Sequence, residues 1–156
     1  MVDNRGVRIS AKADYAVRAA VELASVDGPV KGDRISESQS IPLKFLENIL
    51  IEMRHHGLVR SQRGRDGGYW LAKPAAEITI ADVVRSVEGP LAHVRGEPPE
   101  EVHYGPPAEA LEHVWIAVRA NLRAVVENVT VADVASGTLP PEIERLAKDP
   151  DAWVTR

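Results

Sequence analysis

A cluster of basic side chains between residues 54 and 65 has the clearest chemistry in this sequence. The cluster holds four arginines and two histidines and no acidic residue, although the whole chain has a formal net charge of −4. A local basic patch on an acidic protein indicates a surface that binds phosphate groups. Residues 1–90 carry 13 basic and 12 acidic residues, whereas residues 91–156 carry 6 and 11. The N-terminal part is therefore the candidate for nucleic-acid binding.

Two helices separated by a tight turn are predicted just before this cluster. The first spans residues 32–39, Ser40 begins the turn, and Pro42 suits the first turn of the second helix because its missing N–H is not needed there. The second helix has one core stripe with helical spacing, made by Leu46, Ile49, Leu50 and Met53. This pattern is typical of a helix-turn-helix, whose second helix presents its first residues to the major groove. The candidate DNA-contacting residues there are Ser40, Pro42, Leu43, Lys44 and Glu47.

A basic β-hairpin is predicted next, with strands at residues 60–63 and 69–72 around a glycine-rich turn. Arg63 and Arg65 flank Gly64 at its tip, and a slender tip can enter a minor groove, where arginine is favoured. Glu47 on the preceding helix could accept a hydrogen bond from a cytosine amino group. Helix plus basic hairpin outlines a winged helix. The alternative is a winged helix that serves as a protein-interaction adaptor without specific DNA binding.

Three further helices are predicted from their capping residues. Ser10 can cap a helix that runs to about Ser25. Thr79 begins a helix that ends at Gly89, and Thr130 begins one that ends at Gly137, each with an aspartate three residues later. We interpret the likeness of these two starts as shared capping chemistry and not as an internal repeat.

A long helix is predicted from Pro106 and Pro107 to about Asn128. Its apolar residues step by 4, 3, 4, 3 and 4, a heptad seam formed by Leu111, Trp115, Val118, Leu122, Val125 and Val129. The seam is either an intramolecular core stripe or a dimer interface. We favour the interface, because a small domain has little core to cover it and helix-turn-helix operators have two-fold symmetry.

The expected fold is mainly α-helical with a small β-hairpin wing, a winged helix-turn-helix plus a long dimerisation helix. The expected divisions are a DNA-binding domain at 8–89, a loop at 90–107, the long helix and a short following helix at 108–136, and a Pro-rich tail at 137–156 with Trp153 as its anchor. We expect residues 1–7 to be a loose tail. The loop at 91–107 contains four prolines and is expected to be mobile.

Composition excludes several classes of function. The chain has no cysteine, which removes disulfides, thiolate metal sites and a cysteine nucleophile. It has no apolar run long enough to span a membrane and no apolar signal core near residue 1, so a cytoplasmic protein is expected. The glycines at 64, 67 and 68 lead into a strand and not a helix, so they are a turn and not a phosphate-binding loop. An enzyme is disfavoured.

Five segments of the sequence resemble the Rrf2 family of bacterial transcription regulators. They are ISAKADYAVRA at 9–19, IPLKFLENIL at 41–50, GLVRSQRGRDGGYWL at 57–71, ITIADVV at 78–84 and VTVADV at 129–134. The resemblance covers about residues 8–136. It implies a homodimer with crossed long helices that binds a palindromic double-stranded DNA operator. It also implies reading by the helix from Pro42 and by the wing at Arg63, Gly64 and Arg65, and it suggests a repressor.

The sequence departs from this resemblance at the loop before the long helix. Cluster-bearing relatives place cysteines there, and this chain has none. Iron–sulfur clusters are held mostly by thiolates, so we expect no cluster and no other cofactor. Asp14 matches an acidic ligand of some relatives, but one carboxylate cannot hold a cluster. A nitrogen–oxygen metal site stays open as an alternative to ordinary surface residues, with candidate ligands Asp14, His93, His103 and His113. The sequence leaves three alternatives open for the effector: a small molecule, a partner protein, or no ligand at all.

Overall fold

Seven α-helices, three 3-10 turns and one two-stranded antiparallel sheet make up residues 9–156, the part of the chain that the computed structural model describes. The expected tail at 1–7 and residue 8 of the expected first domain lie outside these residues. The α-helices are α1 Ala11–Ala24, α2 Gly32–Gln39, α3 Leu43–His55, α4 Ile80–Glu88, α5 Leu111–Val126, α6 Val131–Ser136 and α7 Pro141–Ala147. The strands are β1 Val59–Gln62 and β2 Gly68–Leu71, and the 3-10 turns are η1 Ala75–Glu77, η2 Pro99–Glu101 and η3 Pro150–Trp153.

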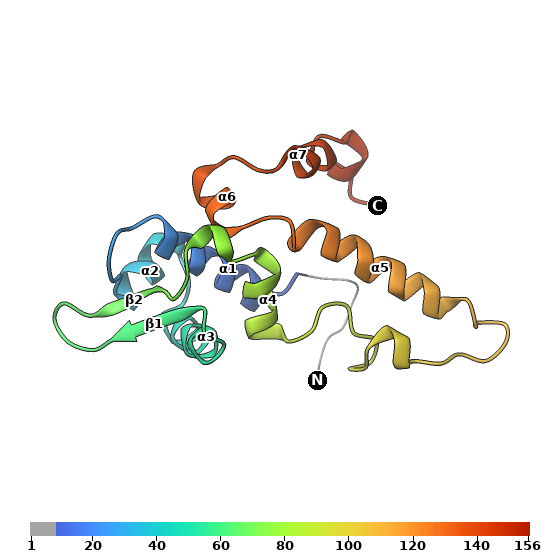
Figure 1. Cartoon of the computed structure of the whole chain (residues 1–156), viewed down its shortest axis with the longest axis horizontal. Coiled ribbons are helices and arrows are strands. Elements are labelled where there is room, and N and C mark those ends of the chain that lie inside the picture. Colours follow the sequence, from blue (N-terminus) through green and yellow to red (C-terminus); the bar gives the residue numbers. More distant parts are fainter. Residues whose placement is uncertain (1–8) are drawn as a thin grey trace.

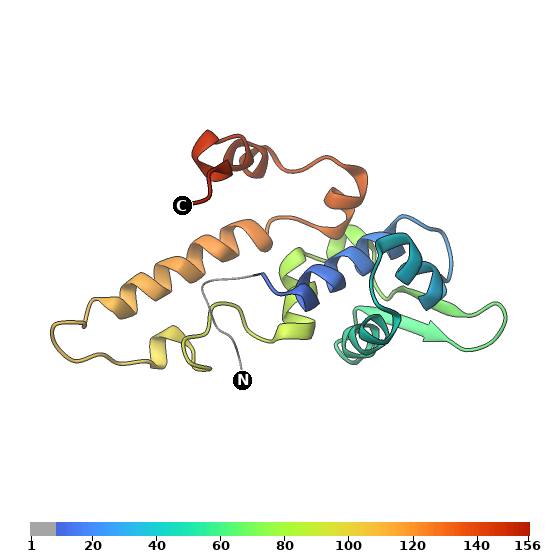
Figure 2. The same cartoon turned by 180° about the vertical axis from the view of Figure 1, so that it is seen from behind.

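Helix α1 is the centre of the winged helix, and Figure 2 shows it running through the middle of that part of the molecule. It packs against α3, α4 and α6. Its buried side chains are mostly alanines, which let the neighbouring helices approach closely: Ala13, Ala16, Ala19 and Ala20. The predicted core stripe of α3 is confirmed, because Leu46, Ile49, Leu50 and Met53 are all buried. The mainly helical fold with a hairpin is therefore confirmed as well.

The turn between α2 and α3 is held by hydrogen bonds from α2 and from α1. Ser40 ends α2 in the left-handed region with φ 52°, and the side chain of Ile41 is buried. The Ser36 hydroxyl donates to the Ile41 carbonyl at 2.6 Å, and Arg18 Nη1 donates to the Gln39 carbonyl at 2.5 Å. Pro42 is the residue before the first turn of α3 and not within that turn, where it was predicted. The direction of α3 is thus fixed at its N-terminus.

The hairpin is attached to the domain along β2. The Tyr69 N–H donates to the Val30 carbonyl and the Val30 N–H donates to the Tyr69 carbonyl, each at 2.8 Å. This close approach needs a glycine beside it. Gly68 has φ 144°, and a Cβ atom on it would lie 2.7 Å from the Val30 carbonyl oxygen. The Lys31 ammonium also donates to the Gly64 carbonyl at the tip of the hairpin.

The two threonine-capped helix starts lie side by side. Both predicted capping boxes are present, Thr79 with Asp82 and Thr130 with Asp133. The two segments also pair antiparallel, since the Ile80 N–H donates to the Val129 carbonyl at 2.9 Å and the Val131 N–H donates to the Ile78 carbonyl at 2.8 Å. This pairing returns the chain to the winged helix after α5. The predicted domain boundaries stay a prediction, although α6 packs on α1.

Helix α5 extends away from the hairpin end of the molecule (Figure 1). It begins at Leu111, so the predicted start at Pro106 and Pro107 is wrong. Proline disfavours helical backbone at the residue before it. Both prolines lie within a turn closed by the Ala108 N–H to the Gly105 carbonyl, and a second turn follows, closed by the Leu111 N–H to the Ala108 carbonyl. No residue of α5 is fully buried.

Two regions have more structure than the sequence indicated. The segment 91–107 was expected to be a mobile loop, but it contains η2 and buries Pro99 and Val102. The expected tail at 137–156 contains α7, which begins directly after Pro140, and η3. Trp153 is 79% exposed, so it does not anchor this region to a core, and its indole N–H donates to the Ala147 carbonyl at 2.6 Å.

The close contact at Gly68 generates a stability prediction. The Gly68→Ala variant should lose about 1–3 kcal/mol of unfolding free energy, because the new methyl group meets the Val30 carbonyl and alanine is strained at this φ. The matched control is Gly105→Ala, where nothing lies within 4 Å of the added atom and the change should stay within about 0.5 kcal/mol. Urea unfolding measures both. Equal stability of the two variants would contradict this view of the hairpin attachment.

Candidate nucleic-acid interface

The start of α3 is an exposed surface, as a reading helix requires. Ser40, Pro42, Leu43, Lys44 and Glu47 are all exposed. Lys44 and Glu47 make no ion pair with any residue in 9–156, so both are open to an outside partner. The structure thus presents the predicted residues of α3 together on one end of the helix. It does not test their contact with DNA.

The predicted wing tip is also exposed at Arg63, Gly64 and Arg65. Gly64 has φ 108° and accepts a hydrogen bond from the Gly67 N–H at 3.1 Å, which closes the turn. Neither arginine pairs with an acidic side chain among the residues that the structure describes. The bond from Lys31, at the start of α2, to the Gly64 carbonyl ties the tip to the helix-turn-helix.

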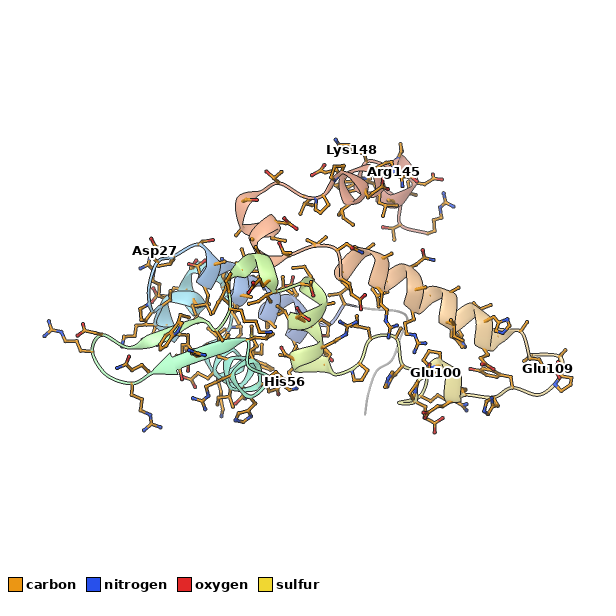
Figure 3. All side chains as sticks on the ribbon, in the orientation of Figure 1. Asp27, His56, Glu100, Glu109, Arg145 and Lys148 are labelled. Atoms are coloured by element: carbon orange, nitrogen blue, oxygen red, sulfur yellow. The ribbon has the colours of Figure 1, made fainter. Side chains whose placement is uncertain are left out.

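A hollow of about 540 Å³ between the C-terminal end of α3 and the hairpin gathers further basic residues. His56 marks this end of α3 in Figure 3. The hollow is lined by Arg54, Arg60 and Lys73 around the indole of Trp70, and Arg54 Nη1 donates to the Ser61 hydroxyl at 3.0 Å. None of these residues was predicted from the sequence as a separate site. Aligning the two predicted strands as an antiparallel hairpin would have indicated one pair of these residues, since Arg60 lies directly opposite Trp70.

The candidate metal ligands do not come together. Within residues 9–156, no three histidine, aspartate or glutamate side chains are grouped as a metal site would require. Asp14 forms an ion pair with Arg18 at 3.0 Å. His103 Nδ1 lies 3.9 Å from a carboxylate oxygen of Glu112, a single neighbour. The described side chains therefore fit ordinary surface roles better than a nitrogen–oxygen metal centre.

The heptad seam of α5 is partly covered by its own chain. Leu111, Trp115, Leu122 and Val125 are half-buried, whereas Val118 is 37% exposed. Val129 lies beyond the end of α5 and is buried in its own chain, so it offers little surface to a partner. Val114, which is outside the seam, is 49% exposed. The exposed apolar surface of α5 therefore includes Val118 of the predicted seam and Val114 beside it.

The segment before α5 packs on the covered side of the helix. Trp115 Nε1 donates to the Tyr104 hydroxyl at 3.0 Å, and Arg119 Nη1 donates to Glu100 at 2.6 Å. Glu100 is labelled on η2 in Figure 3. Its own backbone N–H and the Arg119 guanidinium hold the pKa of Glu100 below its ordinary value. These contacts orient α5 relative to η2.

A helix-turn-helix with an attached basic wing defines a winged-helix DNA-binding transcription regulator, and the comparisons with known proteins agree. The model of the Rrf2 family, described as "Iron-dependent Transcriptional regulator", matches residues 9–137. The chain therefore belongs to the Rrf2 family, as the sequence resemblance indicated. No helix in residues 9–156 is long and apolar enough to cross a membrane.

Three relatives illustrate the similarity. The chain is 50% identical over 145 residues to the HTH-type protein Rv1287 of Mycobacterium tuberculosis, covering 92% of this chain and 90% of the relative. The structure of CymR, the global cysteine regulator of B. subtilis, is 32% identical with a TM-score of 0.72 and covers 85% of this chain and 99% of that one. The structure of T. potens IscR is 28% identical with a TM-score of 0.66 and covers 97% and 94%.

The family description raises the question of iron. An iron–sulfur cluster needs several thiolate ligands, and this sequence has no cysteine. The methionines are no substitute, because Met53 is buried in the core stripe of α3 and Met1 lies outside the described residues. The donor set therefore does not fit an iron–sulfur cluster.

Proposed function

We propose that this protein is a homodimeric, sequence-specific transcription regulator that binds a palindromic operator, acts as a repressor in the cytoplasm, and uses neither catalysis nor an iron–sulfur cluster. In this proposal α3 enters the major groove and the wing enters the adjacent minor groove. The observation that carries it is the joint exposure of the start of α3 and of the basic wing, whose tip is bonded to Lys31 at the start of α2. The effector is a small molecule or a protein of unknown identity.

Selection from genomic fragments followed by a mobility-shift assay tests the proposal. A specific regulator enriches related fragments with two inverted half-sites, because each protomer reads one. A winged-helix adaptor binds all fragments equally or none. Transcription in vitro from a promoter that contains the enriched site then tests repression, which requires a fall in transcript when the protein is added.

The wing should carry much of the electrostatic affinity. If each protomer neutralises about three phosphates, the logarithm of affinity should fall with the logarithm of salt concentration at a slope of about −5. The double variant Arg63→Ala/Arg65→Ala removes two of these contacts per protomer, so its affinity should fall and its slope should flatten to about −2. Mobility shifts at several salt concentrations measure both.

The matched control for the wing removes the same charge elsewhere. Arg145 and Lys148 lie on and just after α7, as Figure 3 shows, and both side chains are mostly exposed. The double variant Arg145→Ala/Lys148→Ala should keep the wild-type slope. An unchanged slope in the wing variant, or an equal change in the control, would remove the wing from the proposed interface.

The proposed dimer rests on the exposed apolar surface of α5. This helix has 16 residues, none of them fully buried, and it carries the exposed side chains of Val114 and Val118. A helix with an apolar stripe normally buries it against another element. A second copy of α5 related by two-fold symmetry would cover the stripe and would place two winged helices on one operator.

A charge at the centre of the seam should separate the protomers. Val118→Glu leaves a carboxylate with access to water in one chain, but a dimer interface would bury it without a partner at a cost of several kcal/mol. The dimer dissociation constant should therefore rise by about 100-fold or more. Sedimentation measures it. The control Ala76→Glu adds the same charge at an exposed position of η1 and should remain dimeric. A Val118→Glu variant that remains equally dimeric would show that the interface lies elsewhere.

The lack of thiolates generates a redox prediction. Protein purified without oxygen should be colourless, and its operator affinity should stay the same after exposure to air, peroxide or nitric oxide, because no cluster ligands are present to be lost. Absorption spectra, iron analysis and shift assays on the same sample test this. A visible absorption band with stoichiometric iron, lost on oxidation together with DNA binding, would overturn it.

A further inference from the structure

An exposed aromatic ring lies on α3, where a water-facing position normally carries a polar side chain. Phe45 is 62% exposed, although it is the chain's single phenylalanine and the core contains many apolar residues. Ile51, six residues along the same helix, is 39% exposed, and Asn48 between them is also exposed. Each exposed apolar side chain forgoes about 25 cal/mol per Å² of stabilisation that a partner surface would restore.

These side chains border a hollow of about 470 Å³ on the surface of α3. Phe45, Ile51 and the buried Ile49 give it apolar walls, and a polar rim is formed by Lys12, Asn48, Glu52 and His55. The acid on this rim is compensated, because Lys12 Nζ lies 2.9 Å from the Glu52 carboxylate. A polyanion can therefore approach the hollow without meeting an unpaired carboxylate on its rim.

Helical spacing places the hollow beside the proposed reading residues. Lys44, Asn48 and His55 are four and seven residues apart, so they share the exposed midline of α3 opposite its buried stripe. Phe45 precedes Asn48 by three residues and lies next to it on the helix surface. A duplex that meets Lys44 in the major groove would therefore also meet Asn48 and Phe45.

The chemistry of the two side chains selects the base pair. In the major groove the apolar group of a base edge is the 5-methyl of thymine, and asparagine matches the N6 and N7 atoms of adenine. We infer that Phe45 packs on a thymine methyl group and Asn48 hydrogen-bonds adenine, so each half-site has A·T pairs under the first two turns of α3. This inference rests on the proposed function. A protein occupant is disfavoured, since the midline carries Lys44 and His55 and the rim acid is already paired.

Base analogues test this on the operator that the full-length protein selects. Each thymine is replaced in turn by deoxyuridine, which removes one methyl group, and each adenine by 7-deaza-adenine, which removes N7. At one position in each half-site, removal of the methyl group should lower the affinity of the wild-type protein about 4-fold. This factor corresponds to about 0.8 kcal/mol for one buried carbon. The Phe45→Ala variant should bind more weakly and be indifferent to that methyl group. Asn48→Ala should likewise be indifferent to N7 at one adenine.

Two further variants keep the test sharp. Lys44→Ala should bind more weakly but retain the full 4-fold methyl dependence, because it leaves Phe45 in place. Phe45→Leu remains apolar and should retain part of that dependence. Since Phe45 is largely exposed, none of these changes should lower the unfolding midpoint appreciably.

The outcomes separate this inference from the proposed function. Sequence-specific binding that ignores every thymine methyl group would overturn the inference and leave the proposed function standing. A methyl dependence that persists in Phe45→Ala would also overturn it, as would unchanged operator affinity in that variant. A wild-type protein that binds no fragment specifically would overturn both.

Discussion

The pairing of the two threonine-capped segments determines how the rest of the molecule is arranged. The bonds that join Ile78 and Ile80 to Val131 and Val129 are 2.8 and 2.9 Å long, and Val131 is fully buried in the winged-helix core. Because the chain leaves this core after α4 and must return to it at α6, the residues between form an excursion closed at its base. Helix α5 therefore extends outward from the domain, with apolar side chains that its own chain covers incompletely.

The same constraint separates the charges of the molecule. The basic residues of α3 and the hairpin lie on the winged helix, and most of the acidic excess lies in residues 91–156. The net charge of the chain is −4, so the protein as a whole is not attracted to nucleic acid. The acidic residues of the distal part therefore reduce nonspecific binding through the rest of the surface. Phosphate attraction is then concentrated at α3 and the wing, which biases the encounter with DNA towards the surface that can read it.

Local chemistry explains which features could be predicted from the sequence. The capping boxes at Thr79 and Thr130 are complete within four residues, and the core stripe of α3 follows from helical spacing alone, so both were predicted correctly. The pairing between the two boxes was not predicted, because it joins residues about fifty positions apart. Phe45 and Asn48 were not predicted as contact residues, because the helical pattern shows that both lie off the core stripe but not that Phe45 stays exposed in the folded chain.

The errors arose where tertiary contacts outweigh local signals. Prolines at 98 and 99 suggested a loop, but Pro99 is buried with Val102 near α5, and this burial orders a segment whose local sequence favours no helix. The sequence favoured a dimer interface over an intramolecular stripe for the seam of α5, and this stays a prediction, although Trp115 already donates to Tyr104 of its own chain. Periodicity identifies an apolar stripe but not the surface that covers it.

The segment between α4 and α5 shows what takes the place of metal ligands in this chain. The family resemblance puts cluster cysteines there, and a cluster would tie the segment together through covalent bonds to iron. Here the segment is held by the burial of two small apolar side chains, one indole–phenol hydrogen bond and the pair between Glu100 and Arg119. Arg119 is 15% exposed and Glu100 is 53% exposed, so water screens this pair and it adds little to stability. These contacts position η2 against α5. The chain that follows α5 is joined to the winged helix by the backbone bonds of Val129 and Val131, whose side chains are buried.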